Sequence, residues 1–202
     1  MRKWTPENYQ VMPWKNGGGS TTELAIFPPG AGLDNFVWRL STAQVDVDGP
    51  FSHFPQIDRT LAILKGDGLV LHSGGEQQRP KEIFLQQDSP PYIFAGETSI
   101  RAELTGGTVI DLNMMTRRDV CTHFMQRLRG GQHFVEAHDA QQLLLYCASG
   151  GATLHNGERM QENDLCLFEE SREHAGIRLE LSADDEAVLY LIRVHFLNVG
   201  DS

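Results

Sequence analysis

The fold of this chain is indicated by the stretch Leu61-Ala-Ile-Leu-Lys-Gly-Asp-Gly-Leu-Val-Leu-His72, in which two apolar runs flank a Gly-Asp-Gly turn. A similar stretch, Leu144-Leu-Tyr-Cys-Ala-Ser-Gly-Gly-Ala-Thr-Leu-His155, follows at a constant offset of 83 residues. Short apolar runs that end at turn formers are typical of β-strands. The two stretches therefore predict a hairpin that occurs twice in the chain.

Further matches extend this repeat in the same order along the sequence. Ile100-Arg-Ala-Glu-Leu104 resembles Ile177-Arg-Leu-Glu-Leu181 at an offset of 77, and Val109-Ile110 resembles Val188-Leu189 at an offset of 79. Helical periodicity is weak throughout, with only Met114 to Arg129 able to carry a helical turn or two. We expect an all-β chain of two barrels, with coincidental similarity between hairpins as the alternative. The expected domains are residues 1–118 and 119–202, joined near residues 116–130.

Composition narrows the class of protein. The chain has 202 residues, 40% of them hydrophobic, and 17 Lys plus Arg against 27 Asp plus Glu, for a formal charge of −10. This acidic balance argues against binding to nucleic acid or to an anionic membrane surface. The start has no apolar signal region, and no apolar run reaches the roughly 18 residues of a membrane span. We expect a cytoplasmic monomer or homodimer with three buried free cysteines.

The predicted hairpin of strands around Gly66 and Gly68 resembles the core of the cupin fold. Metal-binding cupins carry His-x-His, a nearby Glu and a later His, a ligand set that suits a divalent transition ion. The corresponding stretch here, from Gly49 to Arg59, has only His53, and Pro55 stands where the second His would be. We therefore predict neither a metal site nor another cofactor.

Four longer motifs resemble the HutD/Ves family of small bicupins. They are Met12-Pro-Trp-Lys-Asn-Gly-Gly-Gly-Ser-Thr-Thr-Glu-Leu-Ala25, Phe36-Val-Trp-Arg-Leu-Ser-Thr-Ala43, Gly49-Pro-Phe-Ser-His-Phe-Pro-Gln-Ile-Asp-Arg-Thr-Leu61 and Asp111-Leu-Asn-Met-Met-Thr-Arg-Arg-Asp119. The second half resembles the family mainly in its strand pattern. The resemblance implies a bicupin without a known reaction, which in the HutD branch senses a small acid of histidine catabolism.

The glycine-rich segment is one candidate ligand site. Lys15 and Asn16 precede three glycines, whose freedom of φ lets consecutive backbone N–H groups converge on an anion such as a carboxylate. The segment lacks the order of a Walker loop. A simple turn before the strand Glu23–Phe27 is the alternative.

Arg59 is the first candidate for contact with a ligand. It alternates with Leu61 and Ile63, so all three side chains share one face of a strand. If that face lines the barrel, the guanidinium points inward and needs an anionic partner, because an unpaired buried charge is costly. The alternative is an Arg at the barrel rim, bonded to Asp58 or to solvent.

Two more polar residues, Asp111 and Asn113, share one face of the last strand of the first barrel. The offsets of 79 and 83 place Tyr190 and Ile192 at their positions in the second copy, and Gln142 at that of Arg59. The second copy therefore lacks the charged set, which predicts that the first barrel binds and the second supports. A structural ion pair between Asp111 and Arg59 is the alternative.

Three other residues complete the predicted site. Arg39 alternates with Ser41 on a strand and can face the same cavity, although its parity relative to the pocket is open. Ser52 and His53 lie on a loop flanked by prolines, where a hydroxyl and an imidazole can bond a ligand oxygen. The charges of Thr116-Arg-Arg118 are expected in surface pairs.

These residues favour a non-enzymatic protein that binds a small anionic or polar metabolite, with a carboxylate or a formyl group, and senses it in histidine utilisation. No catalytic residue is predicted, since the chain lacks a Gly-x-Ser-x-Gly elbow and a Cys–His signature. A cupin enzyme is the second reading, either a degenerate metal cupin using His53 or a metal-free isomerase or hydrolase with Asp111 as base. A scaffold with a vestigial pocket is the third.

Overall fold

A computed structural model describes residues 1–74, 81–170 and 176–197 of the chain. These residues form β-strands and one short 3-10 helix, η1 (Pro6–Asn8), which confirms the all-β prediction. None of this helical structure has the length and apolar character that crossing a bilayer requires. The chain divides into two compact units, residues Gln10–Asp119 and residues Met1–Tyr9 with Val120–Ser202.

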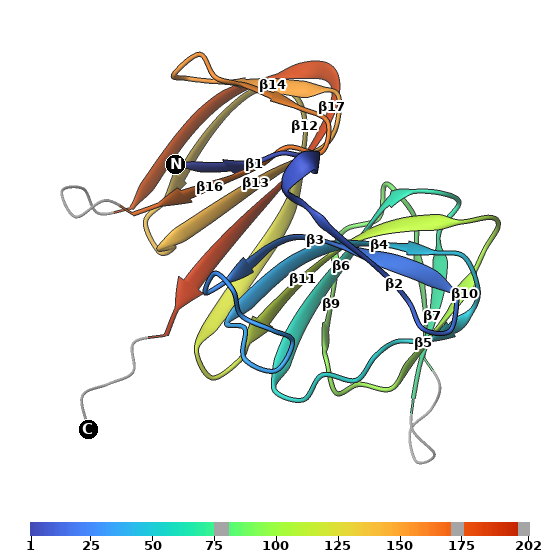
Figure 1. Cartoon of the computed structure of the whole chain (residues 1–202). Coiled ribbons are helices and arrows are strands. Elements are labelled where there is room, and N and C mark those ends of the chain that lie inside the picture. The colour runs from blue at the N-terminus through green and yellow to red at the C-terminus, as the bar shows by residue number, and fades with distance from the viewer. Residues whose placement is uncertain (75–80, 171–175, 198–202) are drawn as a thin grey trace, which may run out of the picture. The chain divides into compact units, whose positions relative to one another are not determined.

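The unit formed by Gln10–Asp119, called the first barrel below, contains two antiparallel sheets in its described part (Figure 1). The larger sheet has the order β2-β3-β4-β11-β6-β9, and the smaller has the order β5-β10-β7-β8. The strands are β2 (Gln10–Pro13), β3 (Gly19–Phe27), β4 (Trp38–Val45), β5 (Gly49–Pro50), β6 (Ile57–Lys65), β7 (Leu69–Ser73), β8 (Lys81–Leu85), β9 (Tyr92–Ala95), β10 (Ile100–Leu104) and β11 (Val109–Arg117). Leu61, Ile63, Leu69 and Leu71 belong to its apolar core.

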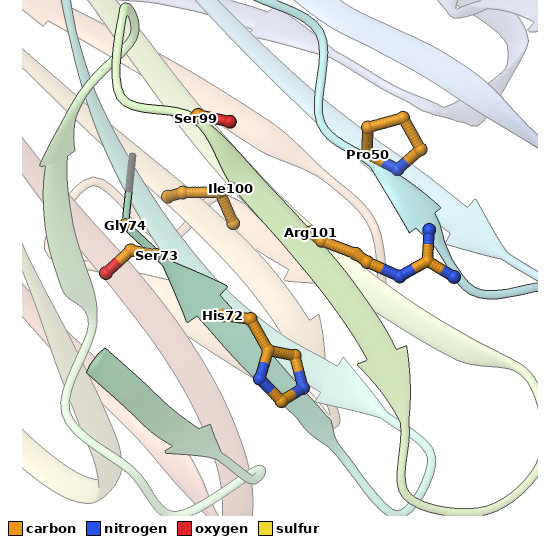
Figure 2. A pocket seen from close by; sticks show the side chains of 7 residues that line it. All are labelled: Pro50, His72, Ser73, Gly74, Ser99, Ile100 and Arg101. Carbon is orange, nitrogen blue, oxygen red and sulfur yellow. The ribbon is translucent and has the colours of Figure 1, made fainter. Parts of the chain in front are cut away.

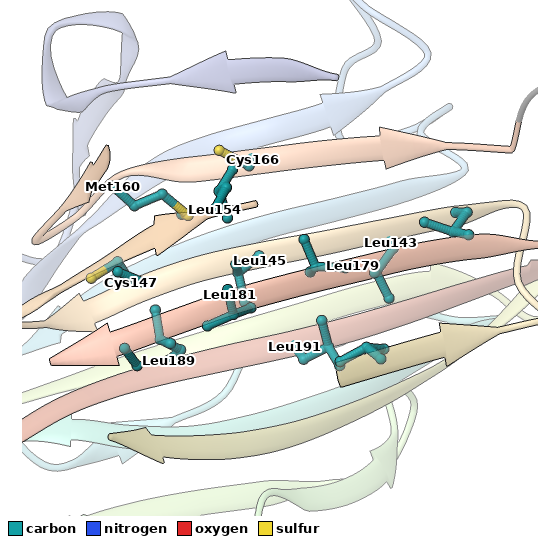
Figure 3. Close-up of a cluster of buried hydrophobic side chains, with 14 of the residues drawn as sticks. Leu143, Leu145, Cys147, Leu154, Met160, Cys166, Leu179, Leu181, Leu189 and Leu191 are labelled. Carbon is teal, nitrogen blue, oxygen red and sulfur yellow. The ribbon is translucent and has the colours of Figure 1, made fainter. Parts of the chain in front are cut away.

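The other unit, called the second barrel, has one sheet in the order β1-β16-β13-β17-β14-β15, with β12 also paired to β17. Its strands are β1 (Arg2–Trp4), β12 (Cys121–Ala137), β13 (Gln142–Ser149), β14 (Gly151–Leu154), β15 (Arg159–Gln161), β16 (Leu165–Glu169) and β17 (Ile177–Phe196). Figure 3 shows the apolar cluster inside it, which includes the buried thiols of Cys147 and Cys166.

The N-terminal segment was expected in the first barrel and lies in the second. β1 pairs with β16, so that Lys3 lies opposite Cys166 in the register. The Lys3 ammonium is 3.0 Å from the Asp164 carboxylate, and the Tyr9 hydroxyl donates a 2.6 Å hydrogen bond to the Asn163 carbonyl. These contacts join residues 1–9 to a partner more than 150 positions away, which no local pattern indicates.

The strand pairing repeats between the two units. β6 lies between β11 and β9, and β7 lies between β10 and β8; in the same way β13 lies between β17 and β16, and β14 lies between β17 and β15. The single strand β17 thus takes the places of both β10 and β11. This repeat confirms the duplication expected from the sequence.

The connection between the copies is shorter than predicted. Thr116 and Arg117 belong to β11, and β12 begins at Cys121, so the expected link at residues 116–130 is strand on both sides of a short turn. The stretch from Met114 to Arg129 accordingly contains no helical turn. The stretch belongs to two long strands, in which side chains alternate between the two faces, and its weak helical periodicity does not produce a helix.

The offsets used to align the two copies are wrong by one residue in the strands that matter most. Each copy has a β-bulge at the same place in the pairing. Next to the bulge of the first copy Asp111 pairs with Ile63, and next to the bulge of the second copy Leu189 pairs with Cys147. Asp111 therefore corresponds to Leu189 and not to Tyr190. The hairpin of the second copy is one residue shorter, and a slip of one residue turns every side chain to the opposite face of its strand.

Candidate functional site

The first barrel encloses a cavity of about 570 Å³ between the large sheet and the residues around β5. Seven of the eight predicted ligand-binding residues line it: Lys15, Asn16, Arg39, Ser52, Arg59, Asp111 and Asn113. The eighth, His53, is exposed and is not among the lining residues. The cavity therefore brings these seven residues together from three strands and two loops.

The register of three neighbouring strands explains why these side chains converge. β11 lies between β4 and β6, and Met115 is opposite Arg39 on one neighbour and Arg59 on the other. Two residues along β11, Asn113 is opposite Ser41. Side chains on directly paired residues point to the same face of a sheet, so these five face the cavity together. The parity of Arg39, which the sequence left open, is thereby decided.

Arg59 is buried, with 6% of its surface exposed. Its Nη1 donates a 3.3 Å hydrogen bond to the Ser52 carbonyl, and its guanidinium carbon lies 5.3, 5.6 and 4.9 Å from the ring centres of Phe51, Phe54 and Phe94. The Nε atom is buried and has no hydrogen-bond partner. Burial lowers the pKa of Arg59 to about 10, so the group remains a cation at neutral pH.

The two arginines of the cavity differ in how their charge is compensated. Arg39 Nε donates a 2.7 Å hydrogen bond to the Glu23 carboxylate. Within the described residues, Arg59 has no carboxylate within 4.0 Å. The proposed alternative of a bond to Asp58 does not occur, because Asp58 pairs with Arg118 at 2.8 Å. Of the two arginines, Arg59 is therefore the one that lacks a carboxylate partner among the described residues.

Asp111 and Asn113 are also buried, with 2% and 8% of their surfaces exposed. In each residue the Oδ1 atom is buried and has no hydrogen-bond partner. Burial raises the pKa of Asp111 to about 7, and the charge of Arg59 opposes this rise. Asp111 and Arg59 therefore interact electrostatically without forming a direct ion pair. The expected alternative, a structural ion pair between them, does not occur.

The glycine-rich segment does not form the predicted anion-binding nest. Lys15 and Asn16 line the cavity, but Gly17 N–H donates to the Trp14 carbonyl at 3.0 Å and Gly18 N–H donates to Asn16 Oδ1 at 3.1 Å. Both backbone donors are therefore used inside the turn between β2 and β3. The alternative of a simple turn before a strand describes this segment.

Sequence reasoning missed the groups that hold the two arginines. Phe51 and Phe54 flank His53 in the motif that was searched for metal ligands, and they contact Arg59 instead. Glu23, at the predicted start of a strand, was not expected to pair with Arg39. A signal for the aromatic pair was present, since Phe51 and Phe54 stand on either side of the loop serine and histidine.

Metal chemistry has little support in the donor set. In the described ranges no three His, Cys, Asp or Glu side chains lie close enough to hold a metal ion. Arg59, Asp111 and Asn113 form a buried polar group in the cavity, and its carboxylate is Asp111. His53 does not line the cavity. The residues present therefore do not fit the four-ligand pattern of metal-binding cupins.

A smaller hollow of about 220 Å³ lies on the other sheet of the first barrel (Figure 2). His72 and Arg101 project from neighbouring strands beside it. The His72 imidazole is 3.1 Å from the Glu103 carboxylate and 3.6 Å from that of Glu82, and both Glu side chains are more than half exposed. This arrangement is typical of a solvated surface cluster.

The second barrel has hydrocarbon where the first has its polar group. By the corrected alignment, Arg59, Asp111 and Asn113 correspond to Leu143, Leu189 and Leu191, and all three leucines lie in the apolar cluster of Figure 3. The earlier comparison with Gln142, Tyr190 and Ile192 used residues of the opposite face. The asymmetry between the copies is consequently sharper than the sequence suggested.

Comparison with known proteins shows which family the chain is similar to. The model of the HutD family matches residues 6–190. A protein of Pseudomonas putida, described as an uncharacterized 21.2 kDa protein in the hutC 3' region, is 40% identical over 109 residues, which are 54% of this chain and 54% of the relative. Protein Ves of Citrobacter koseri is 36% identical over 157 residues, covering 72% of this chain and 78% of the relative.

Solved structures extend the similarity over nearly the full length. A conserved protein of unknown function from Pseudomonas aeruginosa PAO1 has a TM-score of 0.80 and 28% identity, covering 96% of this chain and 98% of its own. HutD from Pseudomonas fluorescens SBW25 has a TM-score of 0.78 and 26% identity, covering 98% and 99%. A Bacillus subtilis oxalate decarboxylase, with a TM-score of 0.64 and 9% identity over 96% of this chain and 76% of its own, shares the cupin fold.

Proposed function

The chain belongs to the HutD family, and from this premise we propose that it binds a small metabolite with a carboxylate or a formyl group in the first barrel and acts without catalysis. Occupancy of the cavity then reports the level of that metabolite to histidine utilisation in the cytoplasm. The second barrel supports the first. In this proposal Arg59 is the main contact of the ligand, Arg39 is a second buried contact, and Lys15 and Asn16 contribute from the exposed side of the cavity.

The observation that carries the proposal is the state of Arg59. Its charge is buried, it has no carboxylate partner among the described residues, and its Nε atom is buried without a hydrogen-bond partner. A buried guanidinium in this state is costly, and the planar fork of its N–H groups matches a carboxylate. The three aromatic rings hold the cation in place and provide no acceptor oxygen.

One relative supports the proposed context. The Pseudomonas putida relative is described as lying in the hutC 3' region. That position belongs to the relative, and for this chain it favours a role in histidine utilisation.

An enzymatic role for the same cavity is the second candidate, because burial raises the pKa of Asp111 to about 7. A carboxylate that titrates near neutral pH suits a general base. Turnover of the bound acid, abolished in Asp111→Asn while binding remains, would establish this reading. Binding without any change in the acid supports the sensing role.

Isothermal titration calorimetry with formate and other small carboxylates tests the proposal. We expect binding by the wild-type chain, and a loss of about 2–5 kcal/mol in binding free energy for Arg59→Ala, the range for breaking a desolvated charge pair. Arg101→Ala is the matched control, since it removes an exposed arginine of the same barrel. Equal affinities of Arg59→Ala and wild type would refute this site.

A further inference from the structure

The inner end of the cavity carries one unused hydrogen-bond donor and two unused acceptors. Arg59 Nε is the donor, and the Oδ1 atoms of Asp111 and Asn113 are the acceptors. All three residues line the cavity and are more than nine-tenths buried. Native proteins satisfy nearly all such groups, so three in one cavity require an explanation.

None of these three atoms has a hydrogen-bond partner among the described residues, and the Asp111 carboxyl group also interacts with the backbone N–H of Ala43. Asn113 faces Ser41 on β4 and Leu61 on β6 in the register, and the Ser41 hydroxyl lies 3.4 Å from an N–H group of Arg39. Water can fill a cavity of this size and bond all three atoms. A ligand that displaces this water must replace its hydrogen bonds, or affinity is lost.

We propose that Asp111 and Asn113 determine specificity by accepting hydrogen bonds from an N–H or O–H group of the ligand, while its carboxylate binds Arg59. This inference rests on the proposed function and narrows it. The ligand class is a small carboxylate with a nearby donor, such as a hydroxy acid or an N-acylated amino acid. A plain aliphatic carboxylate satisfies Arg59 and leaves two buried acceptors without a partner.

The charges in the cavity fix the orientation of the ligand. The ionised form of Asp111 repels a ligand carboxylate placed beside it. Arg59 attracts the same group. The carboxylate therefore lies at the aromatic end, beside Phe51 and Phe54, and the donor lies toward β11.

Matched pairs of acids test this inference in the wild-type chain. Lactate and propionate differ by one hydroxyl group, and N-acetylsarcosine has an N-methyl group where N-acetylglycine has its N–H donor. An unpaired buried acceptor should weaken binding about 10- to 100-fold, so we expect calorimetry to show that preference for the first member of each pair. Equal affinity within both pairs, or a preference for the second member, would overturn the inference.

Two variants locate the preference. In Asn113→Leu, and separately in Asp111→Leu, the preference within a pair should fall, to less than about threefold in the variant that removes the acceptor actually used. A preference that survives unchanged in both folded variants would also overturn the inference. Circular dichroism and thermal unfolding check the fold of each.

The outcomes separate the two proposals. If the acids bind equally within each pair and Arg59→Ala still abolishes binding, the specificity role is wrong and the carboxylate site stands. If no carboxylate binds, or Arg59→Ala changes nothing, the proposed function itself is wrong. Preference in both pairs, together with loss of binding in Arg59→Ala, supports both.

Discussion

Replacement of Asp111 by asparagine should make the unliganded protein more stable at pH 8 and leave it nearly unchanged at pH 4. Burial raises the pKa of Asp111 from about 3.8 to about 7. Between these values the folded state keeps a proton that the unfolded state has released. The stability that Asp111 contributes is therefore fully present below pH 4 and is lost as the pH rises through 7.

The magnitude follows from the two pKa values. Their separation is about three pKa units, and each unit corresponds to about 1.4 kcal/mol, so the wild type loses up to about 4 kcal/mol that the neutral asparagine variant keeps. Urea unfolding of both proteins at pH 4 to 8 measures this directly, as the difference between their free energies of unfolding. A difference that stays constant within about 0.5 kcal/mol over this range would refute the reasoning.

Asp119→Asn is the matched control, because its environment has the opposite effect. Asp119 is on the surface, and the hydrogen bond from Arg117 lowers its pKa. Its contribution is present above the unfolded pKa and is lost as the pH falls. The control variant should accordingly gain nothing relative to wild type as the pH rises to 8.

Four further substitutions test the architecture by urea unfolding. Asn113→Leu should leave the free energy of unfolding within about 1 kcal/mol of wild type, because it removes a buried oxygen that has no partner, while the reverse change at the corresponding position, Leu191→Asn, should cost about 3–5 kcal/mol. Equal effects at the two positions would contradict the assigned asymmetry. Gly68→Ala should cost about 1–3 kcal/mol, because φ is +119° and the new Cβ would lie 2.2 Å from the Leu85 carbonyl oxygen. Tyr146→Phe should cost about 1 kcal/mol by loss of the 2.8 Å hydrogen bond to Asn163, and an unchanged midpoint would count against that bond.

Much of the first barrel could be predicted from local patterns. Alternation placed Arg59, Leu61 and Ile63 on one face, and the structure confirms that this face points inward. The same argument paired Asp111 with Asn113. These predictions succeed because the side chains of a strand alternate with period two wherever the strand lies.

The same rule failed where the partner of a residue was remote in the sequence. Arg39 is neutralised by Glu23, and Asp58 pairs with Arg118 instead of Arg59. Each of these outcomes depends on which side chain arrives from another strand or loop. A sequence shows which groups need partners and does not show which partner is near.

The sequence by itself determined the all-β class, the duplication and the polar set of the first barrel, since strand alternation and turn chemistry are local. Only the tertiary structure decided that Leu189, and not Tyr190, takes the place of Asp111 in the second barrel. The physical reason is that a hairpin shorter by one residue turns every side chain of the preceding strand to the opposite face of the sheet. Such a slip becomes visible only when the paired strand and the core behind it are in place.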